Sequence, residues 1–538
     1  MRKLISIFPI LFAALFAFGQ PNNDANDLGS EEINIIKSYR PLLADAVKIN
    51  FSPTTPAKES FRLSKPYTIP SKFIDLPYDA PDIKPLAYAN QKKEVVNNGL
   101  LKVGFGTQVS PQAELHLTNG ISDRSLLGLK GKYKSSKGNL IHQRMSQGGL
   151  GVYGKLFQKN TSIGGAIDYE FNHFNYYSTT QSDTSFTEDE AKRNFAMIGA
   201  SIDLASTKKN KHHIDHFTKA EYYSLFDNFD GGENGLVAKT KIVKHYNRTK
   251  NQFFVNANLH ALTQNDTIST RSGVTVNLNP NYRFDKFGVN LGLRGSWDSE
   301  TFYVFPELGF DKNLIQDKLN LYNGWRIWLK TNSIRNFLQE NPFLNNRVLV
   351  KNTIVEERYV GIKGALSKSL IYNIKLSQNL YDNLPLYVNS NADRRKFVVV
   401  YDDDPTMLNF HGELGYLFKE KILLNFSADY MNYEMENELK PWHLPSFQTN
   451  LSAQYKLARK ITATGEIYYL SGAYGKLANG SAQKLDAIAD INIGLHYKFS
   501  ESFGIFLDVN NIANVKSEKW LNYPTYGFNT HIGLIARF

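Results

Sequence analysis

The chain of 538 residues contains no cysteine. Disulfide bonds, thiolate metal sites, cysteine nucleophiles and a lipid anchor on an N-terminal cysteine are therefore excluded. Beyond Gln20 the sequence also lacks a long apolar run, whereas a membrane-spanning helix needs about 20 apolar residues in succession. The two absences exclude a disulfide-stabilised protein and a helical membrane protein.

Residues 1–19 have the composition of a signal peptide. Two cations, Arg2 and Lys3, precede an apolar run from Leu4 to Phe18 that ends next to the small residue Gly19. Such a segment directs export and is too short to span a bilayer. We therefore expect an exported protein.

Aromatic residues make up 13% of the chain, with 30 Tyr and 35 Phe, although only 42% of all residues are hydrophobic. This balance is unusual for a soluble core. It is typical of a transmembrane β-barrel, in which every second residue faces lipid and aromatic residues gather at both interfaces. The net charge of +11 could indicate a nucleic-acid partner. The sequence has no basic helix and no nucleic-acid motif, so we expect no nucleic acid.

Residues 20–95 differ from the rest of the chain because prolines interrupt them. No part of this segment alternates for long between polar and apolar residues, so we predict an extended periplasmic segment. Its prolines include Pro53, Pro56, Pro66, Pro70, Pro77, Pro81 and Pro85.

Residues 96–538 consist of segments in which apolar residues recur at every second position, as in strands that face lipid on one side. The clearest segment places Leu485, Ala487, Ala489, Ile491, Ile493, Leu495, Tyr497 and Phe499 on one face. The opposite face carries Asp486, Asp490, Asn492, His496 and Lys498. Such segments are longer than the strands of soluble sandwiches, which average about 5–6 residues.

Short connections alternate with mostly longer ones along this region. The predicted short turns, which should be periplasmic, are Phe157–Asn160, Ser206–His212, Asn247–Asn251, Phe284–Phe287, Leu314–Leu319, Leu366–Leu370, Phe418–Lys421, Leu457–Lys460 and Phe499–Ser502. The predicted extracellular loops are Asn175–Lys192, Phe226–Gly235, Asn332–Lys351, Asp382–Arg395, Met435–Leu444, Gly472–Lys484 and Asn514–Tyr523.

This alternation predicts an all-β fold: a transmembrane antiparallel β-barrel of about 22 strands, within a range of about 18 to 24. The count treats Lys396 to Leu417 as one long strand bent near Pro405. An even number of strands places both ends of the barrel in the periplasm.

The C-terminal strand has the pattern of an assembly signal. One face carries Tyr526, Phe528, Thr530, Ile532, Leu534, Ala536 and the terminal Phe538. This strand resembles the C-terminal strand of outer-membrane proteins that the barrel-assembly machinery recognises. We therefore assign the signal to Phe528, Ile532, Leu534, Ala536 and Phe538.

The last fifty or so residues, including Phe506–Asn514 and Trp520–Gly527, resemble the closing strands and last loop of TonB-dependent receptor barrels. The resemblance extends weakly over the barrel, through Gln339–Phe343 and Val399–Asp403, and implies 22 strands. A receptor of that family carries a folded plug domain before its first strand. The Pro-rich segment is shorter than such a domain and does not have its pattern.

A stretch near the N-terminus resembles a TonB box, an extended sequence that adds as a strand to a periplasmic partner. It lies within Glu31–Ser38, and its candidate partner-binding residues are Glu32, Ile33, Asn34, Ile35 and Ile36. The alternative is an ordinary short apolar patch in a flexible arm.

One cluster invites a transition-metal interpretation, because imidazole and carboxylate groups at close spacing can hold such an ion. On a strand, however, His212 and His216 face one side, while His213 and Asp215 face the other. We therefore expect no metal site there.

The acidic run Asp402–Asp404 could bind calcium at the outer surface, although a solvated acidic run is the simpler interpretation. No spacing of Ser, His and acidic residues singles out a catalytic constellation, so we expect no enzyme and no cofactor.

Two functions remain. The first is a barrel with a transport or transport-associated role, and the second is a non-transporting subunit or scaffold of a larger outer-membrane complex. The expected partners are outer-membrane lipid, the assembly machinery and either a TonB-like periplasmic protein or other outer-membrane subunits. An empty 22-strand barrel would be a wide hole. The N-terminal segment, inward-folded loops such as Asn332–Lys351 and Asp382–Arg395, or another protein must close it.

Overall fold

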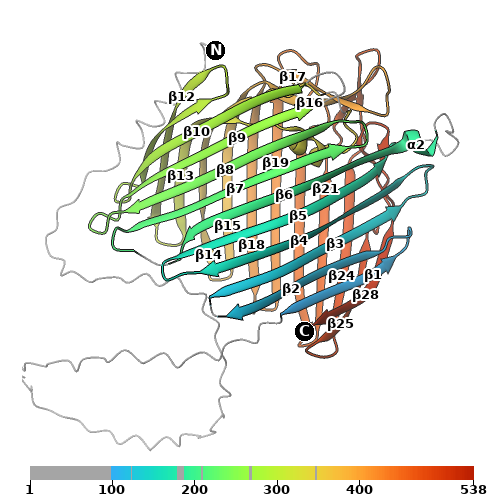
Figure 1. The fold of residues 1–538 in the computed structure, drawn as a ribbon, viewed down its shortest axis with the longest axis horizontal. Helices are drawn as coiled ribbons and strands as arrows, with labels where there is room; N and C mark the ends of the chain where they lie inside the picture. The colour runs from blue at the N-terminus through green and yellow to red at the C-terminus, as the bar shows by residue number, and fades with distance from the viewer. Residues whose placement is uncertain (1–97, 123, 178–186, 208–209, 266–269, 346–347) are drawn as a thin grey trace, which may run out of the picture. The chain divides into compact units, whose positions relative to one another are not determined.

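The computed structural model describes residues 98–122, 124–177, 187–207, 210–265, 270–345 and 348–538. In this part of the chain, 22 antiparallel strands form one sheet (Figure 1). The sheet closes because β1 pairs with β28 as well as with β2. The predicted barrel and its strand number are confirmed. The predicted signal peptide, Pro-rich segment and box-like residues Glu32–Ile36 lie outside the described residues.

The barrel strands have the following bounds: β1 (Gly99–Gly106), β2 (Gln112–Ser122), β3 (Ser125–Lys137), β4 (Arg144–Phe157), β5 (Thr161–Asn175), β6 (Lys192–Ser206), β7 (Ile214–Asp227), β8 (Gly232–His245), β9 (Gln252–Asn265), β10 (Thr270–Phe284), β11 (Val289–Trp297), β12 (Phe302–Ile315), β13 (Leu319–Lys330), β14 (Thr353–Ser367), β15 (Leu370–Asp382), β18 (Thr406–Phe418), β19 (Ile422–Glu434), β20 (Phe447–Ala458), β21 (Ile461–Leu470), β24 (Ile488–Lys498), β25 (Phe503–Asn510) and β28 (Asn529–Arg537).

Three small hairpins and two helices lie in the connections of this described region. The hairpins are β16 (Leu384–Asn389) with β17 (Phe397–Asp402), β22 (Tyr474–Lys476) with β23 (Ala482–Lys484), and β26 (Glu518–Trp520) with β27 (Tyr523–Pro524). The helices are α2 (Glu188–Ala191) and α3 (Ile334–Glu340). No helix among these residues has both the length and the apolarity needed to cross a membrane.

The period-two pattern sorts side chains between the two faces of the wall. On β24, Ile491, Ile493 and Leu495 are exposed on the outer face, and Ile493 keeps 51% of its surface. Asn492 and His496 alternate with them and face the lumen. An outer face of exposed Leu, Ile, Val and Phe side chains suits a lipid bilayer, since the lumen takes the polar residues.

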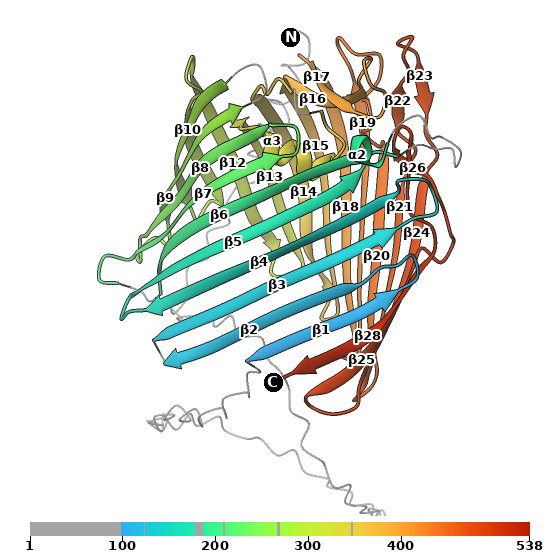
Figure 2. The ribbon, with the colours of Figure 1, turned by 45° about the vertical axis from the view of Figure 1, so that its right-hand side comes forward.

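The connections differ between the two ends of the barrel (Figures 1 and 2). At one end, which we call the turn end, connections of two to seven residues join the strands. At the other end, the loop end, connections reach 23 residues. All nine predicted short turns lie at the turn end. A tenth turn, between β2 and β3, has no signal in the sequence pattern that we used.

Two predictions, one for a loop and one for a long strand, differ from the structure. Phe226–Gly235 is not a long loop, because β7 continues to Asp227 and β8 begins at Gly232. The Asp227 carboxylate accepts hydrogen bonds from the backbone N–H groups of Phe229 and Gly231, which tightens this connection into a short turn.

Lys396 to Leu417, predicted as one bent strand, is divided into β17 and β18. The break lies at Asp403–Pro405, next to the predicted bend. Only β18 belongs to the barrel, and β17 pairs with β16 above the rim. The pairing nevertheless keeps its register across the break, since Leu380 lies opposite Thr406 and Leu384 lies opposite Asp402.

The loop cap and lumen wall as candidate functional site

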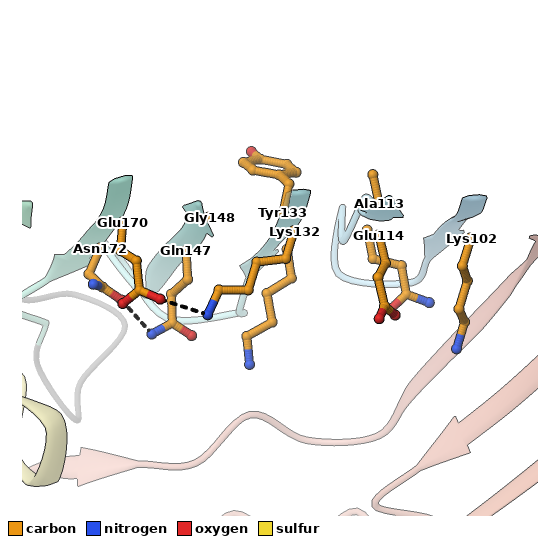
Figure 3. Close-up of a pocket in the computed structure, with 11 residues that line it drawn as sticks. Lys102, Ala113, Glu114, Lys132, Tyr133, Gln147, Gly148, Glu170 and Asn172 are labelled. Atoms are coloured by element: carbon orange, nitrogen blue, oxygen red, sulfur yellow. Dashed lines mark hydrogen bonds and ion pairs between the residues drawn. The ribbon is translucent and has the colours of Figure 1, made fainter. Parts of the chain in front are cut away.

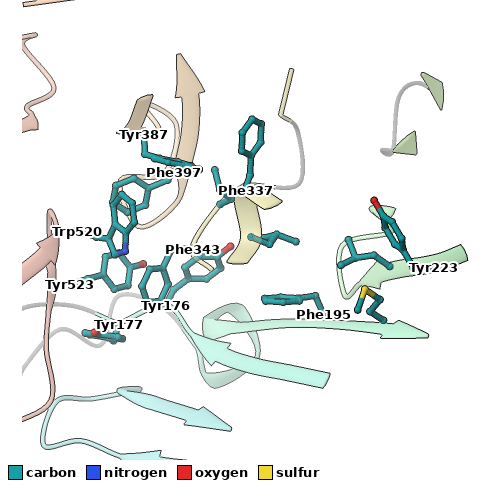
Figure 4. Close-up of a cluster of buried hydrophobic side chains, with 14 residues drawn as sticks. Tyr176, Tyr177, Phe195, Tyr223, Phe337, Phe343, Tyr387, Phe397, Trp520 and Tyr523 are labelled. Atoms are coloured by element: carbon teal, nitrogen blue, oxygen red, sulfur yellow. The ribbon is translucent and has the colours of Figure 1, made fainter. Parts of the chain in front are cut away.

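Inward-folded loops pack an aromatic core across the loop end of the barrel (Figure 4). The buried residues of this cluster, which we call the cap, are Tyr176, Tyr177, Phe195, Met197, Tyr223, Leu225, Phe337, Leu338, Phe343, Leu344, Tyr387, Phe397, Trp520 and Tyr523. Some belong to the lumen faces of β6 and β7, and the others come from four separate connections. Both loops that were considered as closures, Asn332–Lys351 and Asp382–Arg395, contribute to it.

The centre of the cap is a stack between two loops that are far apart in sequence. The rings of Phe343 and Tyr523 lie 3.7 Å apart between centroids, at an angle of 20°. Tyr177 meets Tyr523 edge-on at 4.9 Å. The Phe397 N–H donates a hydrogen bond of 2.9 Å to the Phe343 carbonyl, so backbone contacts reinforce the aromatic ones.

Helix α3 crosses from the β13–β14 connection to the wall formed by β7 and β8. The fully buried Glu233 carboxylate of β8 accepts hydrogen bonds from the backbone N–H groups of Ile334 (2.8 Å) and Arg335 (3.3 Å) at the helix N-terminus. A negative charge at this position is favourable because the helix dipole is positive there. Arg335 also pairs with Glu221 of β7 at 2.6 Å. Charge and hydrogen bonds therefore attach α3 to the part of the wall formed by β7 and β8.

The ring of His443, in the β19–β20 connection, joins two further loops. Its Nδ1 atom donates to the Tyr387 carbonyl at 2.8 Å, and its Nε2 atom accepts from the Leu521 N–H at 3.1 Å. Both bonds require the neutral ring with the proton on Nδ1. Burial lowers the pKa of His443 from its ordinary 6.5 to about 4, against the smaller raising effect of the bond to Tyr387.

Below the cap, the lumen wall carries paired charges. Lys130 lies 2.7 Å from Asp168, and Lys132 lies 3.2 Å from Glu170. Lys132 and Glu170 belong to a groove of about 430 Å³ on the lumen face of β1–β5 (Figure 3). In that view Tyr133 points away from these charged side chains, toward the outer face. We call this groove, with its three lysines and two glutamates, the balanced groove.

The assembly-signal residues lie where the alternation placed them. Ile532 and Leu534 of β28 and the flanking Phe528 and Phe538 are exposed on the outer face, and Ile532 keeps 64% of its surface. Their recognition by an assembly machine stays a prediction. At the seam, the backbone N–H of Phe538 donates to the Gly99 carbonyl at 3.1 Å, and its ring covers the space where a Cβ of Gly99 would lie.

The side chains of the histidine cluster at the start of β7 have separate partners. His216 contacts the Ser206 hydroxyl, His213 contacts Asn247, and Asp215 contacts His245. Within the described residues, no group of three or more His, Cys, Asp or Glu side chains is arranged to hold a metal ion.

The acidic run is not uniformly solvated, contrary to the simpler interpretation of the sequence. Asp402 is fully buried. Its carboxylate accepts hydrogen bonds from the backbone N–H groups of Glu436, Asn437 and Glu438 at 3.2, 3.0 and 2.7 Å. Asp402 therefore organises the β19–β20 connection rather than a cation site.

The closed barrel of 22 antiparallel strands is similar in fold to the solved structures of several bacterial receptors. Similar solved structures include the siderophore receptor PirA from Acinetobacter baumannii, with a TM-score of 0.64 at 12% identity over 83% of this chain and 81% of that chain. A mutant of the ferric enterobactin receptor PfeA from Pseudomonas aeruginosa gives 0.63 at 10% identity over 82% and 80%.

FpvA from P. aeruginosa, bound to heterologous pyoverdines, gives a TM-score of 0.62 at 9% identity over 82% of this chain and 71% of that chain. No protein-family model and no curated protein matches the sequence significantly. At these identities the likeness concerns the fold.

Proposed function

We propose that this chain is an outer-membrane barrel with a transport or transport-associated role, in which the cap gates the outer end of the lumen. The observation that carries the proposal is the contrast between a charged lumen wall and an aromatic cap across one end. A 22-strand barrel is wide enough for a channel. A polar route through the barrel that loops close at one end is the arrangement that a gated transporter needs.

The similar structures support the same class of function, because PirA, PfeA and FpvA are named as receptors or shown with siderophore ligands. The substrate of this chain is not assigned by that likeness. The proposal is limited to passage of a ligand through the barrel, or participation in such passage.

The proposed orientation places the loop end outside the cell and the turn end in the periplasm. Single cysteines at Asn479, in the β22–β23 hairpin, and at Lys419, in a short turn, test it on a background without native cysteine. A membrane-impermeant maleimide should label Asn479→Cys on intact cells and leave Lys419→Cys unlabelled. Protection of the first together with labelling of the second would reverse the orientation.

The gate is tested by detaching α3 from the wall. Glu233→Ala removes the carboxylate that holds the helix N-terminus, so the cap should loosen. Ion conductance in planar bilayers and sensitivity of cells to bulky hydrophilic antibiotics should both rise. Glu300→Ala, at an exposed position in the β11–β12 connection, is the matched control. Wild-type conductance in the Glu233 variant would mean that the loops do not gate the lumen.

Energy for opening would come from the periplasm through the box-like residues Glu32–Ile36. A segment that adds as a strand binds through backbone hydrogen bonds, and proline removes a donor and fixes φ. Ile35→Pro should therefore abolish complementation of the gene deletion at normal barrel abundance, whereas Ile35→Ala should be milder. Full function after deletion of residues 21–45 would exclude coupled transport.

One observation favours the second candidate function, a subunit of a larger outer-membrane complex. Glu356 and Arg358 form an ion pair of 2.5 Å on the outer face of β14, where Trp325 also donates to Glu356 at 2.9 Å. Arg358 lies in register with Trp325, whose other neighbour Leu308 is an exposed outer-face residue. Charged residues on a lipid-facing wall are costly, so a docked subunit that covered this pair would shield it from lipid.

The double variant Glu356→Leu, Arg358→Leu separates the two functions. A subunit that docks through this pair should migrate as a smaller particle on a native gel of outer-membrane extract. A barrel that meets only lipid there should keep its migration and its folded yield.

A further inference from the structure

A second pocket on the lumen wall differs in charge from the balanced groove. It has a volume of about 530 Å³ and lies on the lumen faces of β8–β15. We call it the basic pocket, because five cations line it with a single carboxylate: Lys241, Arg283, Arg326, Lys363 and Lys375 with Asp311.

Ion pairing leaves much of this positive charge uncompensated. Lys363 pairs with Asp311 at 3.0 Å. Arg326 and Lys375 share a single carboxylate, that of the buried Glu357, at 2.6 and 2.5 Å.

Neither Lys241 nor Arg283 has an ion pair with a residue of the described part of the chain. Five cations against the two carboxylates of Asp311 and Glu357 leave a net charge of +3 at the pocket. A lumen wall that needed only structural ion pairs would not carry this excess.

Aromatic rings hold the cations in place. The Lys363 ammonium lies 5.0 Å from the ring centroid of Tyr322, and the Lys375 ammonium lies 5.0 Å from that of Tyr359. The Tyr322 hydroxyl donates to Asn373 at 2.6 Å. The Tyr359 hydroxyl has no hydrogen-bond partner in the described structure and can donate to a ligand. Cations over aromatic faces keep their charge while losing conformational freedom.

From these contacts we infer that the basic pocket binds a small polyvalent oxyanion, with carboxylate or phosphate groups, at the two unpaired cations Lys241 and Arg283. Arg283 supplies a planar set of N–H donors that matches a carboxylate or phosphate group, and Lys241 supplies a compact charge. The shared Glu357 carboxylate leaves Arg326 and Lys375 with donors for further oxygens.

The pocket lies near the turn end of the barrel. Arg283 is the residue before the last one of β10, and Gly288 in the following turn also lines the pocket. In the proposed orientation, the site would therefore lie near the periplasmic side of the barrel. The binding site goes beyond the proposed function, since it needs neither gating nor coupling.

The balanced groove supplies a control on the same wall (Figure 3). Its Lys134 faces the lumen, and Lys132 beside it is already paired with Glu170. Lys134→Gln removes the same charge from the lumen as Lys241→Gln does. It therefore separates binding in the pocket from general attraction of anions by a basic barrel.

The test uses the purified full-length protein in detergent micelles and isothermal titration calorimetry at low ionic strength. Citrate and inorganic pyrophosphate are the probes, and they distinguish the carboxylate from the phosphate source. Spermidine and glucose serve as cationic and neutral comparisons. At least one anion should bind, and spermidine and glucose should not. Arg283→Gln and Lys241→Gln should each weaken binding about tenfold, the loss of one charge-assisted hydrogen bond.

Lys134→Gln should keep the wild-type affinity within about twofold, by the same scale of free energies. Heat-modifiable migration on gels confirms that each variant is folded. Absence of anion binding to the wild type, or equal weakening by Lys134→Gln, overturns the proposal. Because the experiment measures binding and not transport, a failure of the gating proposal alone would not contradict the proposed oxyanion site.

Discussion

At the loop end of the barrel, connections of up to 23 residues pack rings against one another, whereas at the turn end no connection between barrel strands exceeds seven residues. The loop end thus has a hydrophobic core of its own. The turn end is held by the backbone ladder and a few polar side chains. The difference teaches that closure and barrel formation depend on different interactions, so substitutions should be able to affect one without the other.

The largest loss of stability should come from a substitution at the centre of the cap. Tyr523→Ala removes a buried ring that stacks on Phe343, and such truncations cost about 3–5 kcal/mol. The loops should become sensitive to added protease on intact cells while the barrel stays folded. Phe287→Ala, in a turn-end connection with 61% of its surface exposed, is the control and should change nothing. Equal sensitivity of both variants would remove the distinction between the ends.

The second largest loss of stability should come from a substitution in the wall between the two ends. Ile491→Arg places a charge on the outer face and should cost about 2–4 kcal/mol if that face meets hydrocarbon. Asn492→Arg points into the lumen and should be far milder. Urea unfolding in lipid vesicles measures both. Similar costs would contradict the assignment of faces.

Acid should weaken the loop end before the turn end. The folded state lowers the pKa of His443 to about 4 from 6.5, so the neutral ring stabilises the cap fully above about pH 6.5. That contribution, on the order of 2–3 kcal/mol, is lost as the pH falls from 6.5 toward 4. Protonation of Nε2 would break the bond from the Leu521 N–H.

Protease sensitivity of the loops, measured between pH 7 and pH 4, should therefore rise on acidification, roughly through the window of the two pKa values. His443→Gln, which cannot take up a proton in this range, should flatten the dependence. An unchanged pH profile in that variant would assign the acid effect to other groups.

The smallest effect on the folded barrel should come from the seam at the turn end. Phe538→Ser leaves the backbone pairing with Gly99 possible, so a barrel that has assembled should keep nearly its full stability. The amount of folded protein in the outer membrane should nevertheless fall, because the assembly signal is incomplete. A normal yield of heat-modifiable barrel would argue against a signalling role for Phe538.

Sequence alone was sufficient for the wall and for nine of the turns, because alternation at every second residue is local information. It was not sufficient for the loop end. Nothing near Glu233 in the sequence indicates α3, whose residues lie about a hundred positions later. The stack of Phe343 on Tyr523 likewise depends on how two loops that are distant in sequence pack together.

The absence of long-range information from the local sequence pattern also explains the two wrong predictions at the loop end. Phe226–Gly235 carries turn-forming residues over a longer stretch than the turn occupies, so the side-chain bonds of Asp227 rather than composition set its length. Asp402 has the sequence of a solvated acidic run, but neighbouring backbone N–H groups from another loop bury it. Both outcomes depend on contacts that the local pattern does not contain.

The register of the β15–β18 pair continues into the β16–β17 hairpin, so this hairpin connects the loop end directly to the wall. The backbone N–H of Tyr381 donates to the Pro405 carbonyl at 3.1 Å, and that of Asn383 donates to the Asp403 carbonyl at 3.3 Å. Backbone hydrogen bonds therefore continue from the wall into the loops. Tyr387 of the cap therefore belongs to a two-stranded hairpin whose backbone pairing continues into the wall. Asn383, at the base of this hairpin, has a φ of 60°, so the backbone leaves extended geometry there. If the loop end opens, we expect the β16–β17 hairpin to turn at Asn383 while β15 and β18 stay fixed in the barrel.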